Sequence, residues 1–157
     1  MLRKPMLKIR YDPASILTLA FLMFIVFITS SCSQIPQIGL SHNQLFPCPT
    51  TPNCVCSENP VQNGYAAPLK YTGQPGESWQ KARETVTTMG GRIVEENDHY
   101  LHAVFTSRFF RFVDDLELRL DETAGVIHFR SASRTGYSDL GVNRKRIETL
   151  RSLFMKQ

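Results

Sequence analysis

Arginines, hydroxyl side chains and glycines gather between residues 130 and 146, where a predicted strand leads into a predicted helix. One interpretation is an anion site, in which backbone amides at the helix start receive a phosphate or carboxylate and arginines clamp it. The clamping residues would be Arg130, Arg134 and Arg144. The other interpretation is structural, with these arginines paired to acids of the same chain and the glycines serving turns. The candidate acids are Asp114, Asp115 and Asp139.

The histidines and serines do not form a catalytic motif. The four histidines, His42, His99, His102 and His128, lie outside any Gly-x-Ser-x-Gly or His-Glu-x-x-His frame. Ser131 and Ser133 are each an odd number of residues from His128, so along one strand they face away from it. Asp114 and Asp115 are adjacent and also face apart. The sequence favours a non-enzymatic protein with no catalytic residue and no cofactor; an envelope hydrolase is the alternative.

Three cysteines gather in the segment Cys48-Pro-Thr-Thr-Pro-Asn-Cys54-Val-Cys56. In an oxidising compartment a disulfide is the first expectation, and Cys48–Cys54 closes a loop of sensible size. Cys56 would then be free and buried, or paired with another chain. Free structural thiols are a second possibility. A third is a metal carrier, in which His42 joins the three thiols to bind zinc or cuprous copper.

The first 31 residues have the pattern of an export signal. A basic stretch leads into an apolar run from Ile16 to Ile28, which as a helix reaches about 20 Å and falls short of a bilayer core. Thr29-Ser30-Ser31-Cys32 resembles a bacterial lipobox, in which the cysteine thiol receives acyl chains such as palmitate and becomes the new N-terminus. The sequence predicts a signal peptide at 1–31, a lipid on Cys32, and a tether at 32–45. The alternatives are an uncleaved or ordinarily cleaved signal and a buried core helix.

Such an anchor would hold the protein in the cell envelope. Acyl chains contribute about 0.8 kcal/mol per buried methylene, so multiple acylation anchors a protein stably. Ser33 follows the cysteine, and the absence of Asp there favours the outer membrane, facing the periplasm, in a Gram-negative cell. The formal net charge of +4 comes largely from four bases near the N-terminus, so no nucleic-acid partner is expected.

Hydrophobic periodicity predicts a helix, then strands, then a helix. Trp79, Ala82, Val86 and Met89 share one helix face, which Gly90-Gly91 ends. Strands are expected at 92–94, 100–105, 110–120 and 126–131. A final helix is expected from about Leu140, with Asp139 at its N-terminus and an apolar face formed by Ile147, Leu150 and Phe154.

The pairing register can also be predicted. The strand that contains Ile127 and Phe129 must place them beside the alternating leucines Leu116, Leu118 and Leu120. Arg130 then lies opposite Glu117 or Asp115. The expected fold class is α+β: a two-layer domain over residues 46–157, with an antiparallel sheet of about four strands and the N-terminal and C-terminal helices packed on one face.

The motifs Cys48-Pro-x-x-Pro-Asn-Cys54-Val, Phe110-Arg-Phe-Val-Asp-Asp and the run from Arg130 to Arg146 resemble the bacterial family called domain of unknown function 1499. The resemblance covers roughly Phe46 to Phe154, and Cys56 departs from the family's usual Val-Ser-Ser. No activity is implied. The resemblance suggests a characteristic polar surface or internal network formed by Cys48, Cys54, Asp114, Asp115, Arg130, Ser131, Ser133, Arg134, Ser138, Asp139, Asn143 and Arg144.

These observations predict a membrane-anchored, exported lipoprotein that acts as a non-enzymatic binding module for an anionic ligand or an envelope protein. The residues expected to contact that ligand or partner are Arg130, Ser131, Ser133, Arg134, Ser138, Asp139, Asn143 and Arg144.

Overall fold

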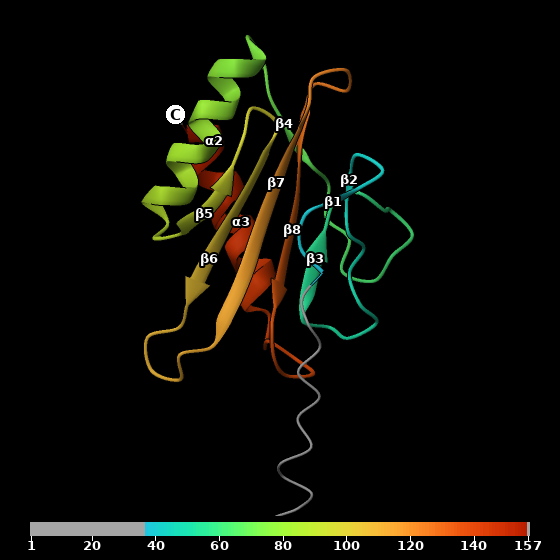
Figure 1. Ribbon diagram of the computed structural model, residues 1–157, viewed down its shortest axis with the longest axis vertical. Coiled ribbons are helices and arrows are strands. Elements are labelled where there is room, and N and C mark those ends of the chain that lie inside the picture. The colour runs from blue at the N-terminus through green and yellow to red at the C-terminus, as the bar shows by residue number, and fades with distance from the viewer. Residues whose placement is uncertain (1–36, 157) are drawn as a thin grey trace, which may run out of the picture. The chain divides into compact units, whose positions relative to one another are not determined.

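The computed structural model describes residues 37–156, so the predicted signal peptide and Cys32 lie outside it. The described residues form an α+β domain with two helices and an antiparallel sheet (Figure 1). The elements in chain order are β1 (Leu40–Ser41), β2 (Gln44–Leu45), β3 (Cys54–Cys56), β4 (Leu69–Lys70), α2 (Pro75–Thr88), β5 (Arg92–Glu96), β6 (Tyr100–Thr106), β7 (Val113–Asp121), β8 (Val126–Ser133) and α3 (Val142–Lys156).

The main sheet contains six strands rather than the expected four or so. Its order is β3-β8-β7-β6-β5, and β4 also pairs with β8. The two additional strands are short and share the free edge of β8, with β3 along its C-terminal half and β4 along its N-terminal half. They were missed because a strand of two or three residues next to prolines and turns carries no readable alternation.

The register between β7 and β8 agrees with one of the two predicted pairings. Leu118 lies opposite Phe129, and Leu120 lies opposite Ile127. Arg130 lies opposite Glu117, not Asp115. The period of two along a strand therefore separates an apolar face from a face of charged side chains.

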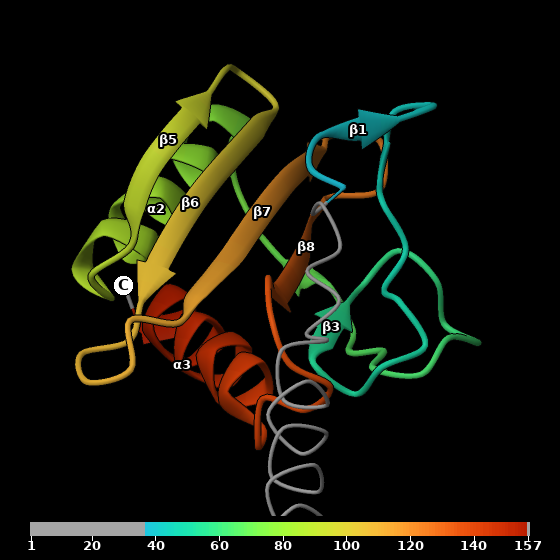
Figure 2. The same ribbon diagram turned by 60° about the horizontal axis from the view of Figure 1, so that its bottom comes forward.

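The apolar face of the sheet contributes to the main hydrophobic core. Leu116, Leu118 and Phe129 are fully buried there. Ala82 and Val86 of α2 belong to the same cluster, as do residues of α3. The α3 members are Ile147, Leu150 and Phe154. Figure 2 shows α2 and α3 beside the sheet, and each contributes an apolar stripe to this cluster.

Glycine ends α2 for a steric reason. Gly90 has a positive φ of 85°, which allows the chain to turn out of the helix into β5. A Cβ on Gly91 would lie 2.7 Å from the ring of Phe105 and 2.8 Å from a methyl of Val86. Gly90 thus ends the helix, and Gly91 lets the backbone pass close to Phe105 and Val86 before β5 begins.

Residues 40–45, expected to belong to the tether, form a small hairpin. His42 and Asn43 have φ values of 52° and 61°, the pattern of a type I′ turn between β1 and β2. Leu45 is 3% exposed, and β2 lies against β7 and β8. The ordered domain therefore begins before residue 46, because this hairpin packs on the charged side of the sheet.

Candidate functional site

The charged face of the sheet is buried and internally paired. Glu117 is fully buried, and its Oε2 accepts a hydrogen bond of 2.8 Å from Nη1 of Arg130. The other oxygen, Oε1, accepts from the hydroxyl of Tyr100 at 2.9 Å and from the backbone N–H of Gly39 at 2.8 Å. The Gly39 bond ties the N-terminal segment to the middle of the sheet. All contacts of this carboxylate are therefore supplied by the chain itself.

Asp115 is the centre of a second group on the same face. Arg134 donates to both of its oxygens, from Nε at 2.9 Å and from Nη2 at 2.8 Å. Nε2 of His102 donates to Oδ1 at 2.8 Å. Burial acts to raise the pKa of Asp115, but the hydrogen bonds from His102 and Arg134 outweigh it and the pKa is lowered. The Asp115 carboxylate is therefore held in its ionised form, and both of its oxygens accept hydrogen bonds from within the chain.

A third group lies at the end of this face nearer the β7–β8 turn. Arg119 donates to Glu58 from Nε at 2.8 Å and to Asp121 from Nη1 and Nη2 at 3.3 Å. Nδ1 of His128 lies 3.7 Å from Glu58 and 3.1 Å from the hydroxyl of Ser57. Burial lowers the pKa of His128, although the charge of Glu58 opposes this.

On the opposite, apolar face of the sheet, Asn143 joins α3 to β8. Its side chain is fully buried and accepts a 2.6 Å hydrogen bond from the hydroxyl of Ser131. Its amide donates to Ser133 Oγ and to the carbonyl of Asn53, both at 3.0 Å. Arg146 completes the group by donating to Asp114 at 2.6 Å and to Ser131 at 2.9 Å.

The start of α3 is already occupied by a carboxylate. Asp139 accepts hydrogen bonds from the backbone N–H groups of Gly141 at 2.9 Å and Asn143 at 2.7 Å. These are the amides that the anion-site interpretation assigned to a phosphate. The hydroxyl of Ser138 accepts from the N–H of Leu140, so it also serves the local turn.

The predicted site residues therefore do not converge on one surface. Arg130 and Arg134 point to the face opposite that of Ser131, Ser133 and Asn143. Ser138 and Arg144 are exposed, and Arg144 makes no ion pair with any described residue. Sequence reasoning selected Arg144 but missed Arg146. Helical spacing could have found it, because 143, 146 and 150 share one face of α3.

The cysteine segment contains the expected disulfide. Cys48 and Cys54 are bonded, and Cys56 is a free, buried thiol. Burial raises the pKa of Cys56, which favours the unreactive thiol over the thiolate. The disulfide uses two of the three sulfurs that a metal carrier would need. Among residues 37–156, no group of three or more His, Cys, Asp or Glu side chains is placed to hold a metal ion.

The serines that the sequence singled out form no nucleophile–base pair with a histidine in the described part of the chain. Ser131 and Ser133 lie on the face opposite His128, as the odd spacing predicted. Ser57 does contact His128, but it is 3% exposed and its hydroxyl accepts the N–H of Phe129. Glu58 approaches the same ring nitrogen as Ser57, whereas a triad needs the acid and the nucleophile on different nitrogens.

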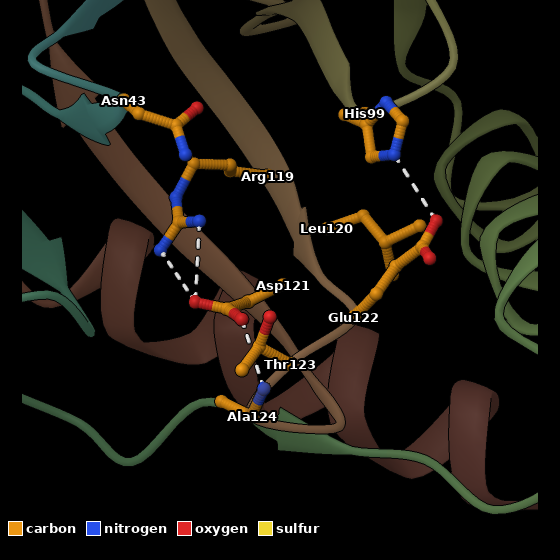
Figure 3. A pocket seen from close by; sticks show the side chains of 8 residues that line it. All are labelled: Asn43, His99, Arg119, Leu120, Asp121, Glu122, Thr123 and Ala124. Carbon is orange, nitrogen blue, oxygen red and sulfur yellow. Dashed lines mark hydrogen bonds and ion pairs between the residues drawn. The ribbon is translucent and has the colours of Figure 1, made fainter.

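A surface pocket lies at the end of the sheet where β7 turns into β8. Figure 3 shows its lining residues: Asn43, His99, Arg119, Leu120, Asp121, Glu122, Thr123 and Ala124. His99 lies 3.1 Å from Glu122, and Asp121 accepts the N–H of Ala124 at 2.9 Å. The predicted site residues do not line this pocket.

In the part of the chain that the structure describes, no helix is long and apolar enough to cross a membrane.

The structure defines an α+β domain that contains a Cys48–Cys54 disulfide and buried pairs of arginine and carboxylate side chains. The sequence model of the family described as "Protein of unknown function (DUF1499)" matches residues 44–154. The chain belongs to this family. A search of curated proteins found no match.

Proposed function

We propose that this protein is an exported lipoprotein, anchored through Cys32, whose domain is a non-enzymatic binding module of the cell envelope. The observation that carries the proposal is the mutual pairing of the polar side chains. Glu117, Asp115 and Asn143 each have their hydrogen-bonding capacity taken up within the chain. Groups that are engaged in this way rigidify a scaffold and are not poised to act on a substrate.

The anchoring part of the proposal rests on the sequence. The apolar run from Ile16 to Ile28 is followed by small residues and Cys32, and the disulfide fits an oxidising compartment outside the cytosol. Ser33, in place of an Asp, favours the outer membrane with the domain in the periplasm if the cell has two membranes. The domain would then present its surface to envelope components.

Within the 130–144 region, only the loop and the first helical turn are free to meet a ligand or partner. Arg130, Ser131 and Asn143 are buried and hold that loop in place. Tyr137, Leu140 and Arg144 are exposed. The binding surface of the module is therefore assigned to these outer residues, and the inner ones are assigned to positioning.

Mass spectrometry of the membrane-extracted mature protein tests the anchor. We expect an N-terminal peptide that starts at Cys32 and carries acyl chains. We expect Cys32→Ser to prevent both the acylation and the cleavage of the signal peptide. The matched control is Cys56→Ser, which should leave acylation unchanged. Recovery of the wild-type chain from the soluble cytosolic fraction, unmodified and starting at Met1, would refute the proposal.

A further inference from the structure

One end of the sheet exposes aromatic and basic side chains together. We name it the loop face: the exposed residues of segments 107–112, between β6 and β7, and 134–144, between β8 and the first turn of α3. Its apolar members are Phe109 (88% exposed), Phe110 (78%), Phe112 (56%), Tyr137 (74%) and Leu140 (95%). Monomeric soluble proteins rarely expose so many large apolar side chains at one place without a partner for them.

The loop face is an ordered part of the fold. Ser107 and Phe112 close the base of the first loop with two hydrogen bonds, of 2.8 Å and 2.9 Å. Phe110 stacks on Phe112, with ring centroids 5.7 Å apart. The second loop begins beside the end of the first, where the N–H of Arg134 donates to the carbonyl of Val113, the first residue of β7. Figure 1 shows both loops at the same end of the sheet.

The charge at the loop face is positive. Arg108, Arg111 and Arg144 are exposed, and none makes an ion pair with a described residue. Segment 107–112 contains no acid, and both oxygens of Asp139 are held by backbone N–H groups. The opposite end, at the β5–β6 and β7–β8 turns, instead exposes the acidic residues Glu96, Asp98 and Glu122. Of these, Glu96 is paired with Arg83 at 2.8 Å and Glu122 lies 3.1 Å from His99.

We propose that the loop face docks on the surface of an anionic lipid bilayer. Aromatic rings favour the headgroup region, where one side is apolar and the other is wet, and arginines are attracted to anionic headgroups. The acidic far end disfavours the reverse orientation. This docking rests on the proposed anchor, because Gly39 is fixed beside Glu117 and the chain from Cys32 to Gly39 can span at most about 25 Å. A lipid on Cys32 would therefore keep the domain close to its membrane.

The inference is tested with the full mature chain in vesicles of phosphatidylglycerol or phosphatidylcholine with brominated acyl chains. Trp79→Phe first removes the single native tryptophan. One indole is then introduced, at the loop face by Phe110→Trp or at the β7–β8 turn by Thr123→Trp. We expect bromine to quench the indole at position 110 and not the one at 123. Quenching should be stronger in the anionic lipid.

Charge removal sharpens the test. Arg108→Gln with Arg111→Gln should lower the docking equilibrium about 25-fold, roughly fivefold for each arginine. The matched control, Lys70→Gln with Lys156→Gln, removes two exposed charges outside the loop face and should leave quenching unchanged. Thermal melting in parallel verifies that each variant is folded. The four substituted charges are exposed, so their removal should cost no stability. Trp79 is half-buried and donates to the carbonyl of Asn97, so Trp79→Phe is the reference for every melting comparison.

Absence of quenching at position 110 while the chain stays with the vesicles would overturn the docking and leave the anchor intact. Equal quenching at both ends would overturn it too. A blue shift that grows with protein concentration in the absence of lipid would identify a second copy as the occupant and also overturn it. If the chain proves unacylated, the anchor fails by itself; vesicles added to that chain still decide the docking by the same contrast of positions and lipids.

Discussion

The interior of the sheet and the loop face both contain arginines, in opposite surroundings. Arg119 and Arg130 are each 5% exposed and lie against carboxylates of the same chain. Arg108 and Arg111 are exposed and have no described acidic partner. A buried ion pair that loses one partner leaves a charge without compensation, whereas an exposed charge stays hydrated. The same residue type thus holds the domain together in one region and is available for binding in the other.

The largest effect is expected from Glu117. In Glu117→Gln the side chain keeps its shape and can still accept bonds from Tyr100 and Gly39, but the charge of Arg130 becomes uncompensated. We expect a loss of about 3–5 kcal/mol in the free energy of unfolding, measured by chemical denaturation. The control is the exposed Glu148→Gln, expected within about 0.5 kcal/mol of wild type. Equal stability of the two variants would break the comparison.

A smaller loss is expected from Asn143. Asn143→Leu fits the space approximately but removes the acceptor of the Ser131 hydroxyl and the amide that donates to Ser133 Oγ. The carbonyl of Asn53 also loses this donor and keeps only the N–H of Ser133. We expect about 2–3 kcal/mol of destabilisation in the same assay. The exposed Asn63→Leu is the control. A variant as stable as wild type would show that this group does not fasten α3 to the sheet.

The smallest effect concerns His128 and depends on pH. Its folded-state pKa is lowered, chiefly by burial, so the unfolded chain binds a proton more readily. Stability should therefore fall as the pH drops through the unfolded value of about 6.5. Glu58, Arg119, Asp121 and Ser57 surround the ring and set the size of the effect. His128→Gln should flatten this part of the stability curve between about pH 7 and pH 5, and the exposed His42→Gln should not. An unchanged slope in His128→Gln would contradict this assignment.

The central strands could be predicted because their side chains alternate. Leu116, Leu118 and Leu120 fix one face of β7, and the requirement to bury Ile127 and Phe129 beside them nearly fixes the register with β8. The disulfide followed from loop length and compartment. Strands β3 and β4 could not be predicted, since they are too short for any period and depend on the free edge of β8.

The candidate site was predicted as a set of residues but not as an arrangement. Sequence distance alone does not show that Arg130 meets Glu117 on one face while Asn143 meets Ser131 on the other. Burial of the charged face could not be foreseen either, because it depends on the β1–β2 hairpin, whose residues have the composition of a tether. Arg146 could have been predicted from helical spacing, which places it on the same face of α3 as Asn143 and Leu150, whereas Arg144 lies on the exposed side.

The most direct test is a single series of unfolding measurements on Arg130→Met, Arg134→Met and Arg144→Met. The buried Arg130 should cost about 3–5 kcal/mol. Arg134, whose side chain is 37% exposed, should cost about 1 kcal/mol once solvent screening is considered. Arg144 should change stability by no more than about 0.5 kcal/mol. Three variants of equal, near-wild-type stability would contradict the assignment of the inner arginines to the scaffold.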